Sequence, residues 1–147
     1  MTETAADSPI LERRFRASAD ELKSIRITVR EHALRAGCEE DEASDLVLAI
    51  DEACQNIIRH AYCGEETGEI ELQLVRSADA LVVSLRDHAP TSDPRCLEAA
   101  RDLQELRPGG LGTHFIRSVM DEVGFVDVPA GEGNLLRMVK RIGRASA

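Results

Sequence analysis

The sequence predicts an α+β domain: a two-layer α/β sandwich in which helices cover one face of a mostly antiparallel sheet. Three observations lead to this expectation. Residues 18–37 and 39–64 carry apolar residues at helical spacing, whereas residues 70–85 alternate apolar and polar residues as a β-hairpin does. A third helical segment at 111–123 is followed by two more strand-like segments. Helices and antiparallel strands in this order bury one face of a sheet beneath helices.

The first strand and the first helix have clear local signals. Residues 12–16, around Phe15, predict a short strand. Ser18 and Glu21 have the spacing of a capping box, and Gly37 offers a C-terminal stop for the helix between them. The apolar stripe of this helix is Leu22, Ile25, Val29, Ala33 and Ala36.

A second helix is predicted behind an acidic entry at residues 39–42, which suits the positive end of a helix dipole. We expect it to end near Tyr62 and Gly64. Its apolar stripe is Leu46, Ile50, Ala53, Ile57 and Ala61.

The hairpin that follows has two apolar faces joined by a polar turn at residues 77–79. The expected inward residues are Ile70, Leu72, Leu74, Leu81, Val83 and Leu85. From residue 88 to residue 110 the alternation stops and three prolines interrupt the chain. A connection of this length is usually functional or mobile.

The C-terminal part is predicted to contain a helix at 111–123 that buries Phe115, Ile116, Val119 and Met120. Two closing strands are expected at 125–128 and 135–142, joined by a glycine-rich turn at 131–133. The predicted organisation is therefore a flexible tail at 1–10 and one domain at 11–143.

Composition narrows the class of protein. The chain has 147 residues, of which 43% are hydrophobic and only 3% aromatic, so the core must consist of aliphatic side chains. No apolar run approaches the roughly 20 residues needed to cross a bilayer, and residues 1–9 lack the pattern of a secretion signal, so a cytoplasmic protein without a membrane partner is expected. A formal net charge of −9 disfavours direct binding to nucleic acid.

Four cysteines, Cys38, Cys54, Cys63 and Cys96, contain no pair with two intervening residues. Cys54, His60 and Cys63 could be imagined as a metal site, but their spacing matches no zinc framework. Reduced thiols are the better interpretation.

Glu52 and Asn56 lie one turn apart on a face of the second helix roughly opposite its apolar stripe. An amide oxygen is able to ligate Mg²⁺, and a carboxylate one turn away is able to accept a proton from a nucleophile. Taken alone, the pair is a weak signal, and a solvated polar face is the plainer interpretation.

Two further signals follow in the sequence. Asp87 ends the predicted hairpin, and its carboxylate is suited to accept from the exocyclic amine of adenine, although a turn residue is the plainer interpretation. Gly109, Gly110 and Gly112 stand before the third helix, where glycines let a phosphate approach the backbone and the helix N-terminus. Taken alone, a simple loop-to-helix joint is the plainer interpretation of these glycines.

The order of these signals, more than any one of them, resembles a known family. The chain is similar to the anti-sigma-factor serine/threonine protein kinases of the GHKL ATPase superfamily, the RsbW and SpoIIAB kind, whose fold is called the Bergerat fold. The similarity covers about residues 11–142 and is carried by three segments, Leu48–Tyr62, Gly109–Val123 and Gly133–Lys140.

The resemblance implies ATP and Mg²⁺ as cofactors and a role for each matching residue. Glu52 would be the general base, Asn56 the Mg²⁺ ligand and Asp87 the acceptor for adenine. Residues 88–110 would form the lid. The implied ATP-binding residues are Asn56, Asp87, Ala89, Gly110, Leu111, Gly112 and Thr113. It also implies a serine-bearing antagonist protein as substrate, a sigma factor or similar regulator as second partner, and a homodimer.

One departure from the family keeps an alternative open. The family usually has Asp-x-Gly where this chain has Asp87, His88 and Ala89, followed by Pro90. The added methyl is the smallest possible change, so nucleotide binding is expected to survive. A catalytically weak binding module of the same fold is the alternative. The ATPase half of a sensor histidine kinase is disfavoured, because His32 lies too close to the nucleotide fold to belong to a separate domain.

Overall fold

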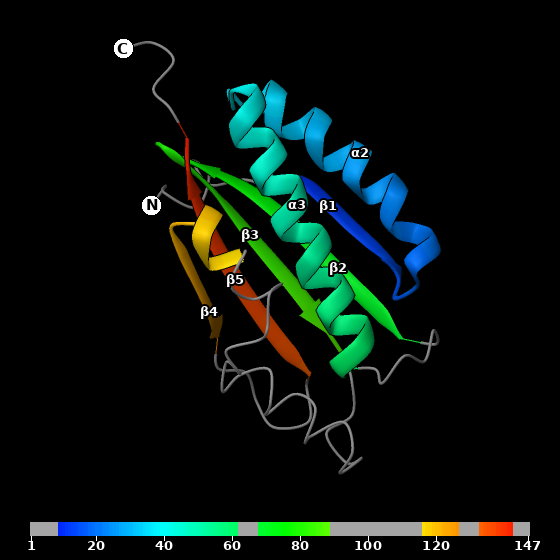
Figure 1. The fold of residues 1–147 in the computed structure, drawn as a ribbon. Helices are drawn as coiled ribbons and strands as arrows, with labels where there is room; N and C mark the ends of the chain where they lie inside the picture. The colour runs from blue at the N-terminus through cyan, green and yellow to red at the C-terminus, as the bar shows by residue number, and fades with distance from the viewer. Residues whose placement is uncertain (1–8, 62–67, 89–115, 127–132, 143–147) are drawn as a thin grey trace.

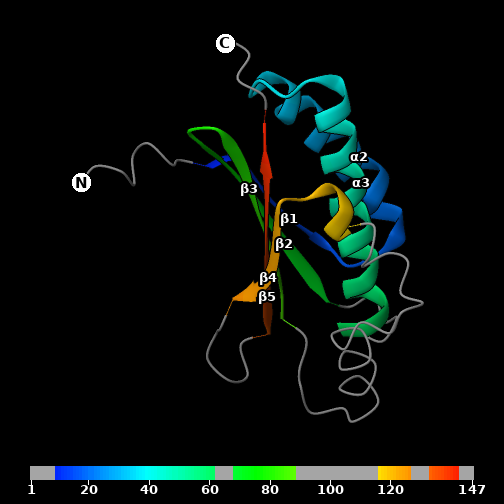
Figure 2. The same ribbon diagram turned by 60° about the vertical axis from the view of Figure 1, so that its left-hand side comes forward.

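The computed structural model describes residues 9–61, 68–88, 116–126 and 133–142. Within them a five-stranded antiparallel sheet has the strand order β1-β2-β3-β5-β4. Two long helices, α2 (Ala19–Arg35) and α3 (Glu40–Asn56), lie on one face of this sheet (Figures 1 and 2). The predicted two-layer α+β sandwich is confirmed.

Strand β1 (Pro9–Arg16) begins earlier than predicted and includes two residues that were assigned to the flexible tail. Its residues Leu11 and Phe15 point into the core. The rest of the predicted tail, residues 1–8, lies outside the described residues. The early start follows from pairing, because Pro9 is in register with Val75 at the far end of β2.

Helix α2 begins and ends where the sequence predicts. The Ser18 hydroxyl accepts from the Asp20 amide at 3.3 Å, which satisfies one free donor of the first turn. Gly37, with φ of 110°, follows the last turn. The Glu21 carboxylate lies 3.9 Å from the Arg16 guanidinium.

A reciprocal capping box forms at α3. The Glu39 side chain accepts from the backbone of the first turn, and the Glu39 amide donates to Glu42 Oε1 at 2.8 Å. The predicted apolar stripe is buried as far as Ile57. A π-helical turn, η1 (Ile57–Ala61), directly continues α3. The burial of Ala61 and the predicted end near residues 62–64 lie outside what the structure describes.

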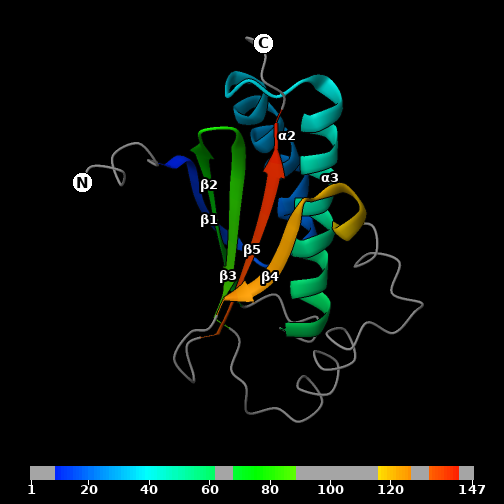
Figure 3. The same cartoon turned by 90° about the vertical axis from the view of Figure 1, so that its left-hand side faces the viewer.

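The hairpin of β2 (Glu69–Ser77) and β3 (Ala80–Asp87) confirms the predicted pairing and its inward face. All six inward side chains are almost completely buried: Ile70, Leu72, Leu74, Leu81, Val83 and Leu85. Strand β5 (Asn134–Arg141) pairs with β3, and β4 (Glu122–Val126) forms the outer neighbour of β5 (Figure 3).

The predicted third helix is wrong at its C-terminal end. In the described part of this segment only residues 116–119 are helical, and β4 starts at Glu122, earlier than the strand predicted at 125–128. The helix ends and the strand begins here because Asp121 bonds to β5: its amide donates to Val139 O at 2.8 Å, and its carboxylate accepts from the Arg141 amide at 2.6 Å. Ile116 and Met120 are buried as predicted, and Val119 is half-buried. The predicted start at 111–115, the end of the strand at 127–128 and most of the glycine-rich turn lie outside the described residues.

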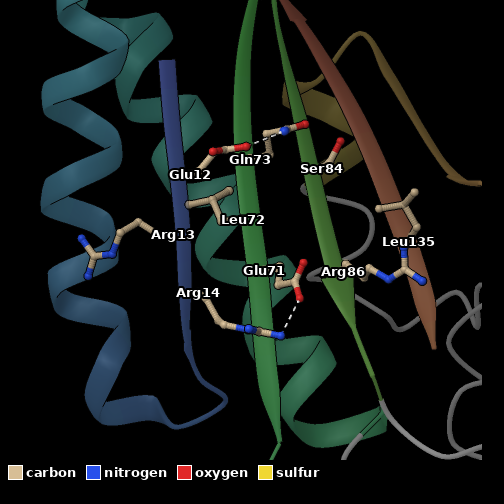
Figure 4. Close-up of a pocket in the computed structure, with 9 residues that line it drawn as sticks. All are labelled: Glu12, Arg13, Arg14, Glu71, Leu72, Gln73, Ser84, Arg86 and Leu135. Carbon is tan, nitrogen blue, oxygen red and sulfur yellow. Dashed lines mark hydrogen bonds and ion pairs between the residues drawn. The ribbon is translucent and has the colours of Figure 1, made fainter. Parts of the chain in front are cut away.

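The face of the sheet away from the helices is polar. Arg14, Glu71 and Arg86 are in register across β1, β2 and β3, and Leu135 of β5 continues this row. These side chains contribute to a cavity of about 410 Å³ (Figure 4). None of the helices in the described residues is long and apolar enough to cross a membrane.

Candidate active site

Three segments that are distant in sequence meet at one end of the sandwich. The C-terminal end of α3, the end of β3 and the start of β5 lie at the same end of the molecule (Figure 1). Glu52 and Asn56 are on α3, Asp87 ends β3, and Asn134 begins β5. The antiparallel register of β3 and β5 pairs Asp87 directly with Asn134. The cavity on the open face of the sheet is lined by none of these four residues.

Glu52 and Asn56 lie one turn apart on α3, as predicted, and both side chains are partly exposed. A third residue joins them. Arg59, in the π-helical turn, donates from Nη2 to Asn56 Oδ1 at 3.0 Å, and the same nitrogen lies 3.5 Å from Glu52 Oε2. The guanidinium therefore links the predicted base to the predicted metal ligand.

Asp87 is buried, with 3% of its surface exposed, although it is the last residue of a strand. The side-chain amide of Asn134 donates to its two carboxylate oxygens at 3.2 and 3.4 Å. A buried carboxylate needs such partners, since burying a charge without them is costly. Asn134 thus fixes the orientation of Asp87 as a hydrogen-bond acceptor, which is the property that recognition of an adenine amine requires.

Gly133 brings the two strands together at this point. It has φ of 82°, and a Cβ atom built on it would lie 1.9 Å from the carbonyl oxygen of Asp87. Any residue other than glycine is therefore disfavoured at position 133 for two reasons: the positive φ and the lack of space for a Cβ atom. This glycine sets the start of β5 against the end of β3.

His88 follows Asp87 and turns toward the open face of the sheet. Its Nε2 lies 2.9 Å from Glu71 Oε2, and Arg14 Nη2 lies 3.1 Å from the same oxygen. The hydrogen bond from His88, helped by the positive charges of His88 and Arg14, holds the pKa of Glu71 below its usual range. This contact ties the first residue of the predicted lid to β2.

Asn56 and Glu52 are the candidate ligands for a magnesium ion. Among the described residues no group of three or more His, Cys, Asp and Glu side chains is arranged to hold a metal. Mg²⁺ in nucleotide sites usually has one or two protein oxygens and takes its other ligands from phosphates and water. The Asn56 amide oxygen beside the Glu52 carboxylate fits that mode of binding.

Several predicted site residues cannot be placed. Ala89, Gly110, Leu111, Gly112 and Thr113 lie outside the described residues, as does the predicted lid except for His88. Their roles stay predictions. Cys63 of the imagined metal site lies outside the described residues too.

The two described cysteines behave as core residues. Cys38 and Cys54 are both free and buried. Burial raises the pKa of the Cys38 thiol to about 11, and it raises the pKa of Cys54 still further. Both thiols are therefore protonated at neutral pH and unsuited to nucleophilic chemistry.

Sequence reasoning missed two residues of the site, Arg59 and Asn134. Arg59 could have been found, because it stands three residues after Asn56 and seven after Glu52, on the same helical face. Asn134 could have been found only from the strand register, which places it opposite Asp87.

The fold is of the class predicted from the sequence, an α+β sandwich with the candidate residues at one end, and comparison with known proteins gives it a family. Residues 15–140 match the family described as "Histidine kinase-like ATPase domain". The chain belongs to this family.

Within the family, the chain is similar to the serine-protein kinase RsbW. It is 30% identical over 144 residues to RsbW of Bacillus pumilus (strain SAFR-032), a match that covers 92% of this chain and 87% of the relative. It is also 30% identical over 141 residues to RsbW of Bacillus cereus (strain AH187), covering 91% and 86%. The expected resemblance is confirmed, and with it the assignment to the serine-protein kinase class.

Two solved structures share the fold. The structure of the RsbU and RsbW domains of Rv1364c from Mycobacterium tuberculosis matches with a TM-score of 0.64 at 19% identity, covering 92% of this chain and 32% of that longer chain. A chain in the SiaB–SiaC complex from Pseudomonas aeruginosa also matches with a TM-score of 0.64, at 20% identity, covering 94% and 93%. These likenesses confirm the α+β architecture.

Proposed function

We propose that this protein is an ATP- and Mg²⁺-dependent kinase that phosphorylates a serine on a small antagonist protein and that sequesters a sigma factor or similar regulator. The observation that carries the proposal is that the end of α3, which bears Glu52 and Asn56, and the end of β3, which bears the buried Asp87, lie at the same end of the sandwich (Figure 1). A proton acceptor, an amide oxygen and a fixed carboxylate are the groups that base, metal and adenine require.

Each residue has a distinct task in the proposed reaction. Asp87, oriented by Asn134, accepts a hydrogen bond from the adenine amine. Asn56 Oδ1 would hold the Mg²⁺ ion, which when bound would supply positive charge against the phosphates. Glu52 accepts the proton of the serine hydroxyl while the serine oxygen bonds to the γ-phosphorus. The bond from that phosphorus to the bridging oxygen breaks, and ADP leaves.

The proposed partners follow from the relatives. RsbW is named a serine-protein kinase, and SiaB was solved in complex with SiaC. Both names support a kinase that works by contact with other proteins. We extend this to an antagonist substrate, a sigma-type regulator and a homodimer. The formal charge of −9 makes direct nucleic-acid binding unfavourable, and free Cys38 and Cys54 suit the reducing cytoplasm.

Thermal unfolding with and without Mg²⁺-ATP tests the nucleotide site. Ligand at about 100 times its dissociation constant stabilises a fold by roughly 2.7 kcal/mol, which is several degrees in a domain of this size. We expect a shift in the wild type that requires Mg²⁺ and is lost in Asp87→Ala and Asn56→Ala. A wild type that shows no shift at millimolar ATP would contradict the proposed site.

Transfer of labelled γ-phosphate to a serine-bearing partner tests the catalytic part. We expect Glu52→Ala to bind nucleotide and to lose transfer. Binding without transfer in the wild type would favour the alternative of a regulatory module that acts only through protein contacts.

A further inference from the structure

Arg59 occupies the oxygen on which the proposed metal binding depends. Its Nη2 donates to Asn56 Oδ1 at 3.0 Å and lies 3.5 Å from Glu52 Oε2, while Nη1 donates to Gln55 Oε1 at 3.3 Å. The guanidinium is permanently charged. A second cation bound to the same amide oxygen would lie within a few ångströms of it, where two positive charges repel strongly.

We propose that Arg59 is an internal cation that competes with Mg²⁺ for Asn56 and so sets the Mg²⁺ concentration at which the protein binds nucleotide. This inference rests on the proposed function, because that function assigns Asn56 Oδ1 to the metal. Arg59 pairs with Glu52 and donates to Asn56. The Arg59 side chain must leave Oδ1 before a divalent cation is bound there.

The contacts of Arg59 suit a reversible competitor. About half of its side-chain surface, 52%, is exposed, and its three contacts in this cluster are to residues of the preceding helix α3. Exposed pairs of this kind are individually weak. The Arg59 side chain is therefore held only by weak contacts. It is able to move away from Asn56 without any rearrangement of the core. Arg59 is part of the π-helical turn η1, which starts directly after Asn56. From there its guanidinium contacts side chains of α3.

The same helix provides a matched control. Arg26 of α2 pairs with Asp51 at 2.9 Å, one position before Glu52 in sequence, and its side chain is 42% exposed. This pair joins α2 to α3 and has no described contact with Glu52 or Asn56; Asp51 reaches the Arg59 cluster only through Gln55, whose Nε2 donates to Asp51 Oδ2 at 2.7 Å. Arg26→Met removes one positive charge near the site without freeing Asn56.

The experiment measures Mg²⁺ titrations of binding by a fluorescent ATP analogue, mant-ATP, for the wild type, Arg59→Met, Arg59→Lys, Arg26→Met and Asn56→Ala. Because exposed pairs are weak, we expect Arg59→Met to lower the half-saturating Mg²⁺ concentration by about threefold. Arg59→Lys, which keeps the charge but loses the fork of donors, is expected to fall between Arg59→Met and the wild type. Arg26→Met is expected to match the wild type.

The outcomes separate this inference from the proposed function. Mg²⁺-dependent binding that is lost in Asn56→Ala, together with an unchanged or raised midpoint in Arg59→Met, would overturn the competition by Arg59 alone. An equal fall of the Mg²⁺ midpoint in Arg26→Met would also overturn the competition by Arg59, because the loss of any nearby positive charge would then explain the effect. No Mg²⁺-dependent binding in the wild type would overturn the proposed function and this inference with it.

Discussion

The side-chain amide of Asn134 donates to both carboxylate oxygens of Asp87 across the β3–β5 ladder, at 3.2 and 3.4 Å. This pair converts a strand-ending aspartate into a buried and oriented acceptor. A rotated carboxylate would present its lone pairs elsewhere, so the orientation is as important as the charge. The start of the last strand is thereby part of the candidate adenine site.

Asn134→Ala is expected to weaken mant-ATP binding by about tenfold, since a hydrogen bond to a charged group contributes about 1.5–3 kcal/mol when it is shielded from water. Fluorescence titration at saturating Mg²⁺ measures the effect. The matched control is Gln73→Ala, which removes another amide–carboxylate pair across neighbouring strands, between Gln73 and Glu12 at 3.0 Å on the open face. Equal affinities of Asn134→Ala and the control would contradict a role for Asn134 in the site.

Gly133→Ala is expected to destabilise the fold by about 1–3 kcal/mol, because the left-handed backbone conformation alone costs that much for a residue with a Cβ. The contact with Asp87 O at 1.9 Å adds strain that the backbone must relieve. Urea unfolding measures the loss.

Gly124→Ala is the matched control for Gly133. A Cβ at Gly124 would have no atom within 4 Å, and its φ is outside the left-handed region. We expect little change in the free energy of unfolding there. A similar loss in both variants would show that the close approach of Gly133 to Asp87 does not hold this end of the sheet together.

The sequence predicted the layers well because their signals are local. Ser18 and Gly37 bound α2, and the alternation from Ile70 to Leu85 defines the hairpin, so each element could be found without knowing its neighbours. The prediction of where the third helix ends was wrong because that end depends on a contact with a distant strand. Asp121 leaves the helix because Val139 and Arg141, on a strand that comes later in the chain, capture its hydrogen-bonding groups.

The part of the site that depends on local spacing was predictable, and the part that depends on strand pairing was not. Glu52 and Asn56 stand on one helix, and their common face follows from spacing alone. The burial of Asp87 and its pairing with Asn134 depend on the register of two strands separated by 47 positions, which no local pattern encodes. Arg59 lies between these cases: its spacing was available in the sequence, but its position in a π-helical turn was not predicted.

Cys38 and Cys54 are expected to resist alkylation by iodoacetamide at pH 8 in the folded protein. Thiolate is the reactive form, and burial raises the pKa of Cys38 to about 11 and that of Cys54 further. Peptide mass spectrometry after native and denatured labelling measures both sites, with the denatured sample as the control. Cys38 modification should increase as the pH rises toward 11. Rapid native labelling of Cys54 would contradict its complete burial in the hydrophobic core.

Glu71 gives the fold a pH dependence whose sign follows from its lowered pKa. A carboxyl group with a folded pKa below its ordinary value of 4.5 stabilises the fold at pH values above 4.5, and this contribution is lost as the pH falls through the folded pKa. Glu71→Gln is therefore expected to unfold at lower urea concentration at pH 7. The loss should be small, about 0.5 kcal/mol, because the pair with His88 is exposed.

The difference between Glu71→Gln and the wild type should disappear in the most acidic buffer in which the wild type remains folded, since protonated Glu71 and glutamine are then both neutral. Urea unfolding at pH 7 and at acidic pH measures this. His88→Ala provides the second arm, because it removes the partner whose hydrogen bond is the largest cause of the lowered pKa. A difference between Glu71→Gln and the wild type that persists unchanged in acid would mean that the glutamine disturbs the β1–β2–β3 row by its shape, and that the ion pair with His88 and Arg14 contributes nothing.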